Sequence, residues 1–165
     1  MKNRFKNILM ASSLTALTAC GSGGGGGGAV STVTNFIQND LSNLSGSESI
    51  VSSYSSLISN FNSTISSGDI SSIQAILTGP DADDIAKANT LLTQLSTAET
   101  LWSQTEELIA SQSDSDQYTI YNSDSYKEAY AAFLYLKNSV KPIIQKVANG
   151  RTITLADYNT IAKED

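Results

Sequence analysis

The side chains of this chain that are able to do covalent or acid–base chemistry are few in kind. The sequence has one cysteine, Cys20, and no histidine among its 165 residues. Histidine is the commonest general base near neutral pH and the commonest ligand of transition metals. Serine nucleophiles of the Ser-x-x-Lys and Gly-x-Ser-x-Gly kinds also have no match in the sequence. The chemistry that remains belongs to the Cys20 thiol, the carboxylates and the tyrosine rings.

Cys20 closes an N-terminal segment with the layout of a secretory signal. Three basic residues lie within the first six positions, and a short apolar run follows from 8 to 17. This run is too short to cross a bilayer. The segment ends in Leu17-Thr18-Ala19-Cys20, which resembles a bacterial lipobox, where the signal is cut before the cysteine and the cysteine is acylated. An ordinary cleaved signal is the alternative, but the chain's only cysteine falls at the lipid position.

The lipobox resemblance implies a membrane anchor for whatever follows it. Residues 1–19 are then a lipoprotein signal peptide, and the mature chain starts at an acylated Cys20, for instance with palmitate. One acyl chain binds a membrane only marginally, whereas the binding free energies of several chains add up to a stable anchor. Lipoproteins of this kind typically carry three. Gly21, rather than Asp, implies the outer membrane by the sorting rule of enteric bacteria. Residues 20–29, rich in glycine, are expected to be a flexible tether rather than a phosphate-binding loop.

The charge of the mature chain is acidic. Removing residues 1–19 takes away three cations and no acid, so the formal net charge of −6 becomes −9. This balance argues against nucleic acid as a partner. Six of the remaining cations lie after residue 126, against four acids, and we expect them to pair mainly within the domain rather than with a partner. No cysteine is left for a disulfide or a zinc site, and no metal or other cofactor is expected.

Two groups of carboxylates are candidates for a calcium site or a catalytic pair. Asp81, Asp83 and Asp84 have the beginning of a calcium-loop spacing, but the other ligands of an EF-hand are missing. Acids at this point also suit the start of a helix, where they accept from free amides, and we favour this interpretation. Glu106 and Glu107 are adjacent, so on a helix they point in different directions. They are expected to be solvated charges rather than a catalytic pair.

The spacing of apolar residues predicts an all-α fold. Steps of three and four residues are typical of helices packed along one face. They predict a single domain over 30–165, an elongated bundle of about four main helices plus short ones. The expected helices cover 30–44, 51–65, 70–77, 81–111, 126–147 and 154–161. The expected core includes Ile58, Phe61, Leu95, Trp102, Phe133 and Val140.

Three local signals refine this prediction. Glycines at 46, 79 and 150 are expected to end helices. Ser125 is expected to cap the last long helix, and Pro142 should kink that helix, since its ring clashes with the preceding turn. Residues 111–125 form a polar break, for which the sequence fits either a strand-like turn or a short helix.

Tyrosines near this break form the predicted contact region. Tyr118 and Tyr121 lie in the polar segment, and Tyr135 lies off the apolar stripe of the following helix. Tyrosine offers a large apolar area with a polar tip, which suits protein interfaces. These three residues are therefore the candidate partner contacts, and Tyr118 and Tyr121 are expected to be dispensable for folding.

The sequence favours a non-catalytic function. The leading hypothesis is a membrane-anchored envelope lipoprotein that acts as a binding, adaptor or structural protein, with membrane lipid and an envelope protein as its partners. A hydrolase of envelope glycans is one alternative, which would require two carboxyls at a defined separation across a cleft. A carrier of a small ligand is another, which would require a cavity between the helices.

Overall fold

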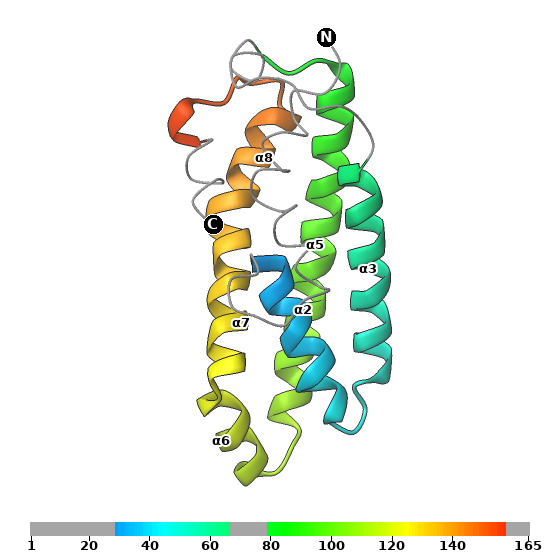
Figure 1. Cartoon of the computed structure of the whole chain (residues 1–165), viewed down its shortest axis with the longest axis vertical. Coiled ribbons are helices and arrows are strands. Elements are labelled where there is room, and N and C mark those ends of the chain that lie inside the picture. Colours follow the sequence, from blue (N-terminus) through cyan, green and yellow to red (C-terminus); the bar gives the residue numbers. More distant parts are fainter. Residues whose placement is uncertain (1–28, 67–78, 158–165) are drawn as a thin grey trace.

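The computed structural model describes residues 29–66 and 79–157, and every regular element in these ranges is a helix. An all-α fold is thus confirmed. The elements, labelled as in Figure 1, are α2 (Ala29–Asn39), the 3-10 turn η2 (Leu41–Asn43), α3 (Glu48–Ser66), α5 (Ala82–Ala110), α6 (Asp114–Asn122), α7 (Asp124–Tyr135), the π-helical turn η3 (Leu136–Val140) and α8 (Lys141–Ala148). Four parts of the prediction lie outside the described residues: the signal peptide, Cys20, the helix at 70–77 and the second half of the helix at 154–161.

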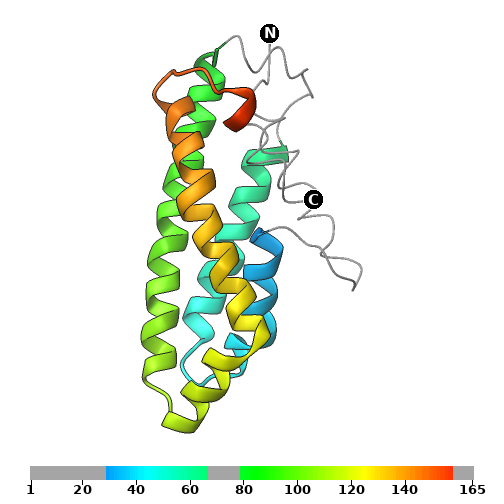
Figure 2. The same cartoon turned by 90° about the vertical axis from the view of Figure 1, so that its left-hand side faces the viewer.

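The helices form an elongated bundle around α5, the longest of them. α3 packs along one side of α5, and α8 packs along another. α7, η3 and α8 follow each other as one continuous rod (Figures 1 and 2). The short α2 packs on α7 and accompanies only part of the bundle's length (Figure 1). α6 makes the turn between α5 and α7 at one end of the molecule.

The buried side chains divide into two clusters along the bundle. The first joins the N-terminal half of α5 to η3 and α8. The second joins α2, α3 and α7 to the C-terminal half of α5 and contains most of the aromatic residues. The first is built from Ala88, Leu91, Leu95, Val140, Ile143, Ile144, Val147 and Ile153. The second is built from Val33, Phe36, Ile37, Leu41, Ile50, Tyr54, Leu101, Trp102, Ile109 and Ala129.

The predicted core is confirmed for half of its members. Leu95, Trp102 and Val140 are buried. Ile58, Phe61 and Phe133 are only half-buried; Ile58 and Phe61 border a space that α2, α3 and α5 leave between them. An aspartate at position 58 would therefore cost less than a fully buried charge. Phe36, which the sequence did not single out, is 1% exposed.

The start of α5 confirms the interpretation of its acidic residues as a cap. The Asp81 side chain accepts from the Asp84 amide at 2.9 Å, and the Asp84 side chain accepts from the Asp81 amide at 3.1 Å. Each carboxylate thus satisfies an amide that the helix leaves free. Asp83 is exposed. These reciprocal hydrogen bonds give Asp81 and Asp84 a structural role at the start of α5.

The end of α8 is a Schellman motif built on Gly150. This glycine has a φ of +71°, in the left-handed region. The Gly150 amide donates to the Val147 carbonyl and the Arg151 amide to the Lys146 carbonyl, both at 2.9 Å. The predicted stop at residue 150 is confirmed.

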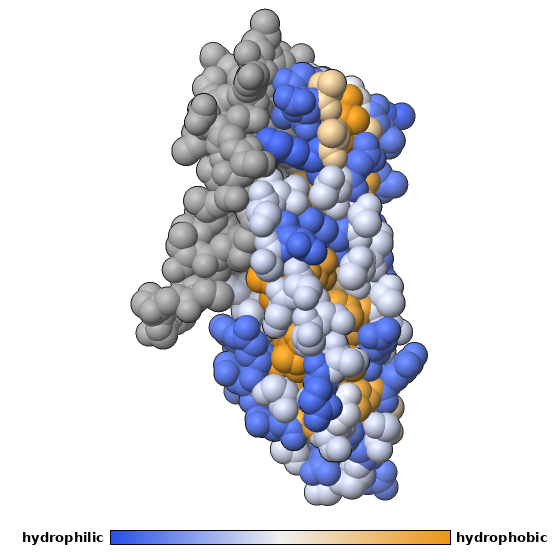
Figure 3. Space-filling model, turned by 90° about the vertical axis from the view of Figure 1, so that its right-hand side faces the viewer, coloured by the Kyte–Doolittle hydropathy of each residue, from blue (hydrophilic) through white to orange (hydrophobic). Residues whose placement is uncertain are grey.

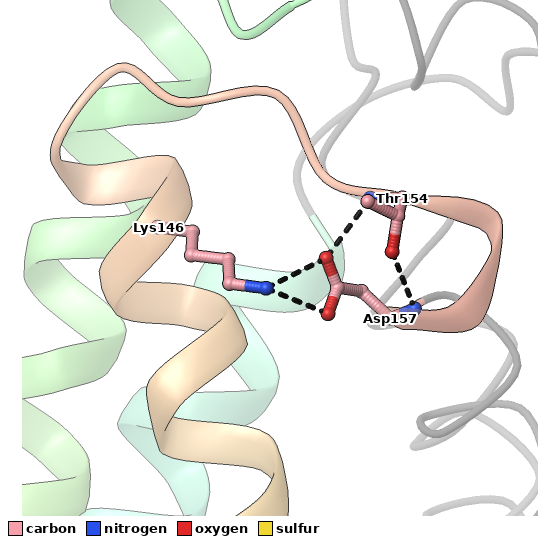
Figure 4. Close-up of polar contacts among 3 residues, drawn as sticks. All are labelled: Lys146, Thr154 and Asp157. Carbon is pink, nitrogen blue, oxygen red and sulfur yellow. Dashed lines mark hydrogen bonds and ion pairs between the residues drawn. The ribbon is translucent and has the colours of Figure 1, made fainter.

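A second reciprocal cap lies just beyond that motif. The Thr154 amide donates to the Asp157 carboxylate at 2.9 Å, and the Asp157 amide donates to the Thr154 hydroxyl at 3.1 Å (Figure 4). Lys146 on α8 donates to both carboxylate oxygens, at 2.8 and 3.0 Å. Burial alone would raise the pKa of Asp157, but the hydrogen bonds from Lys146 and Thr154 outweigh it and lower this pKa. This cap lies at the predicted start of the helix at residue 154, and the bonds of Lys146 to Asp157 tie the chain after α8 back onto that helix.

A π-helical turn precedes Pro142, the residue that is predicted to kink the last long helix. The Lys141 amide donates to the Leu136 carbonyl, five residues back, instead of four. Proline has no amide proton, and its ring clashes with the carbonyl of the preceding turn. The wider turn of η3 accommodates both effects, so the rod continues into α8.

Two predictions about polar side chains have different outcomes. Ser125 was wrongly predicted as the N-cap of α7: the cap is Ser123, and the Ser125 hydroxyl donates to Asp40 beyond the end of α2. Pairing of cations within the domain is confirmed for Lys141, which forms a 3.0 Å ion pair with Glu99 on α5, and for Lys146.

Candidate contact surface

The polar break between the two long helices is itself helical. Ser113 accepts from the Asp116 amide at 3.2 Å and caps α6, and Ser123 accepts from the Tyr126 amide at 3.2 Å and caps α7. Serine competes with the backbone for hydrogen bonds inside a helix but stabilises its first turn. Two caps ten residues apart therefore cut this serine-rich segment into a short helix and the start of a long one. None of the residues of α6 is buried.

Glu106 on α5 holds this corner together. The Tyr126 hydroxyl donates to Glu106 Oε1 at 2.7 Å, and the Tyr121 hydroxyl donates to Oε2 at 3.3 Å. Burial raises the pKa of both tyrosines, and the negative charge of Glu106 raises it further. The prediction for the glutamate pair is thus wrong in part: Glu107 is exposed, whereas Glu106 is half-buried and bonded to two helices.

The rings of α7 stack on Trp102 of α5. Trp102 lies nearly parallel to Phe133, with ring centroids 5.0 Å apart, and to Tyr130, at 6.1 Å. Tyr130 is in turn parallel to Tyr126, at 6.0 Å, and Tyr121 meets Tyr126 edge to face at 5.1 Å. Offset stacks and edge-to-face pairs are the favourable arrangements of aromatic rings. The aromatic cluster is thus a packed unit of the bundle.

The three predicted contact residues lie in different environments. Tyr118 is 73% exposed on α6. Tyr121 is half-buried between Tyr126 and Glu106. Tyr135 is half-buried against the first hydrophobic cluster, near η3. The structure therefore does not bring the three together on one exposed surface.

The exposed aromatic area at this end belongs to Tyr118 and Tyr130. Tyr130 is 42% exposed although its ring stacks on Trp102 and Tyr126. Its spacing of one helical turn from Tyr126 by itself predicts a position on the buried stripe of α7. Tyr130 lies at the margin of the stripe, and no signal in the sequence separates a marginal position from a central one.

The remaining carboxylates do not assemble into a cation site. Within residues 29–66 and 79–157 there is no group of three or more acidic or cysteine side chains placed to hold a metal ion. The acids at key positions have structural partners instead: Asp84 caps α5, Glu99 pairs with Lys141, and Asp157 pairs with Lys146.

The alanine variants of Tyr118 and Tyr121 are expected to differ in stability. Tyr118→Ala should leave the melting temperature unchanged, since the side chain is largely exposed. Tyr121→Ala should cost about 1–3 kcal/mol, because it removes a ring contact and a hydrogen bond to Glu106. Thermal unfolding followed by circular dichroism measures both. Equal melting temperatures for the two variants would contradict the assignment of Tyr121 to the packed cluster.

None of the described helices is long and apolar enough to cross a membrane. The chain matches no model of a known protein family, no curated protein and no solved structure. Its function has to be inferred from its own residues.

Proposed function

We propose that this protein is a bacterial envelope lipoprotein, anchored through acylated Cys20, whose helical domain acts by binding rather than by catalysis. The observation that carries the anchor is the run Leu17-Thr18-Ala19-Cys20 after a short apolar segment with a basic start. The outer membrane is the proposed location, because Gly21 follows the cysteine. The tether then presents the helical bundle at the membrane surface.

The carboxylates of the helical domain support a binding function, because the buried ones make structural hydrogen bonds. The hydrolase alternative requires two carboxyl groups facing each other across a cleft. The half-buried Glu106 instead accepts hydrogen bonds from two tyrosines, and Asp84, the most buried acid described, caps a helix. Tyr118 and Tyr130 supply exposed aromatic area near a helix corner, which fits a contact with an envelope protein.

Mass spectrometry of the mature N-terminus tests the anchor. We expect the chain to begin at Cys20 and to carry the added mass of its acyl chains, and Cys20→Ser to move the protein from the membrane fraction to the soluble fraction. Ser22→Ala, two residues away, is the matched control and should stay in the membrane. An unmodified Cys20 in the mature protein would remove the anchor from the proposal.

Co-purification of the lipidated protein with its neighbours tests the binding function. We expect a stoichiometric envelope partner whose recovery falls in Tyr118→Ala and Tyr130→Ala. Recovery should not fall in Leu155→Ala, which changes an exposed residue in the segment after α8. Hydrolysis of cell-wall fragments by the isolated protein, lost on one carboxylate substitution, would favour the enzyme instead. The ligand-carrier alternative is favoured by a different part of the molecule, a cavity between α2, α3 and α5.

A further inference from the structure

An apolar cavity of about 60 Å³ lies between α2, α3 and α5, with η3 at one wall. It is lined by Val30, Val33, Thr34, Tyr54, Leu57, Ile58, Phe61, Gln94, Leu95, Ala98 and Leu136. The half-burial of Ile58 and Phe61 is explained by this space, which their side chains border. At a share of about 30 Å³ for each water, the volume corresponds to about two water molecules, or to the last few carbons of an alkyl group.

The cavity walls are poorly suited to holding water. A buried water molecule needs two to four polar partners, and the described lining offers few. The Thr34 hydroxyl is already committed, since it donates to the Val30 carbonyl at 2.7 Å. An alkyl group, by contrast, needs no hydrogen-bond partner, and the transfer of its apolar surface from water into the cavity is favourable in free energy. The lining therefore favours an apolar occupant.

Two of the residues that line the cavity each have a buried polar atom with no hydrogen-bond partner among the described residues: the Tyr54 hydroxyl and Gln94 Oε1. Tyr54 is 4% exposed, and its hydroxyl lies near that of Thr105 without a hydrogen bond of normal geometry to it. The Gln94 amide is oriented by α3, because its Nε2 donates to the Thr64 hydroxyl at 2.9 Å. An unpaired buried polar atom costs about 1–3 kcal/mol. A ligand hydroxyl donating to Gln94 Oε1 would remove that cost.

A groove of about 380 Å³ between α3 and α5 adjoins the cavity. It shares Leu57 and Gln94 with the cavity lining. All but one of its described lining residues carry a hydroxyl or an amide group beside their apolar atoms: Ser52, Ser53, Ser56, Leu57, Asn60, Thr93, Gln94 and Thr97. On this side of the molecule, weakly polar residues cover much of the surface and apolar side chains show between them (Figure 3). Gln94 and Leu57 thus lie between the groove, which is lined mainly by hydroxyl-bearing residues, and the apolar cavity.

We propose that the cavity and the groove together bind a small neutral amphiphile, an alkyl group with a hydroxyl-bearing head such as a sugar. The end of the alkyl group occupies the cavity, its remaining carbons pass Leu57, and the head lies in the groove, where the serine and threonine hydroxyls and the Asn60 amide bond to it. The described lining of both parts contains no charged side chain. An anionic head would therefore lose its hydration without gaining a counter-charge. This binding does not depend on acylation of Cys20.

Titration calorimetry with three probes tests the chemistry of the ligand. The protein used is the chain from residue 20 with Cys20→Ser, which retains every described residue and needs no detergent. Hexyl β-glucoside, below its micelle concentration, is expected to bind saturably at one site. Hexyl sulfate has the same chain with an anionic head, and methyl β-glucoside has the same head without the chain; both should fail to bind. Equal binding of hexyl sulfate, or no saturable binding of hexyl β-glucoside, would overturn the proposal.

Variants place the site within the bundle. Ala98→Leu fills the cavity and should abolish binding of hexyl β-glucoside while keeping or raising the melting temperature. Ala86→Leu is the matched control, the same change at an exposed position of α5, and should bind like the parent. Gln94→Met removes the unpaired acceptor at similar volume and should weaken binding about tenfold, the worth of one hydrogen bond. Unchanged affinity in both Ala98→Leu and Gln94→Met would overturn the assignment of the cavity.

Discussion

Replacing Trp102 by alanine is expected to destabilise the bundle by about 3–5 kcal/mol, the usual cost of deleting a large buried aromatic side chain. Trp102 is 4% exposed and contacts rings from two other helices, Phe36 on α2 and Phe133 on α7. Its removal leaves a void that the stiff helices can fill only in part. A domain of ordinary stability has about 5–15 kcal/mol in total, so the variant should unfold at a much lower urea concentration.

Trp102→Phe is the control for that loss. The indole Nε1 is buried and has no hydrogen-bond partner among the described residues. Phenylalanine keeps a ring in the stack and removes this unpaired donor, so it should cost well under half as much as alanine. Urea unfolding followed by circular dichroism compares the three proteins. An alanine variant as stable as the parent would show that the aromatic cluster does not hold α2 and α7 to α5.

Raising the pH above about 10 is expected to destabilise the protein steeply. Tyrosine in an unfolded chain ionises near pH 10. In the folded protein, burial raises the pKa of Tyr54, Tyr121 and Tyr126, and the charge of Glu106 adds to this increase in all three. A raised folded pKa means that the stabilisation is complete below pH 10 and is lost as the pH climbs toward the folded values. The midpoint of urea unfolding should therefore stay level from neutral pH to about 9 and then fall.

Single tyrosine substitutions separate this effect from the titration of lysines, which also begins near pH 10. Tyr126→Phe removes one of the ionising hydroxyls and should flatten the fall at alkaline pH. Tyr118→Phe changes a largely exposed hydroxyl and should leave the slope as it is in the parent. Identical alkaline slopes in the two variants would contradict a role for the Glu106 cluster.

The sequence determined the all-α fold and three of the helix ends because those signals are local. Apolar spacing defines a helix face within a few turns, and the caps at Asp81 and Thr154 and the stop at Gly150 act on amides and carbonyls of the neighbouring residues. All three are confirmed. The lipobox is local in the same way, and it stays a prediction because Cys20 lies outside the described residues.

Tertiary structure alone decided which side chains at similar helical spacing are buried. Tyr126 and Tyr130 are one turn apart, yet only Tyr126 reaches Glu106, while Tyr130 is at the edge of the contact with α5. The difference depends on where α5 and α2 cross α7, which no short-range pattern specifies. The cavity beside Gln94 depends likewise on how far apart α2, α3 and α5 lie. The apolar face of a helix follows from the spacing of its own residues. The distances between helices depend on all the contacts between them together.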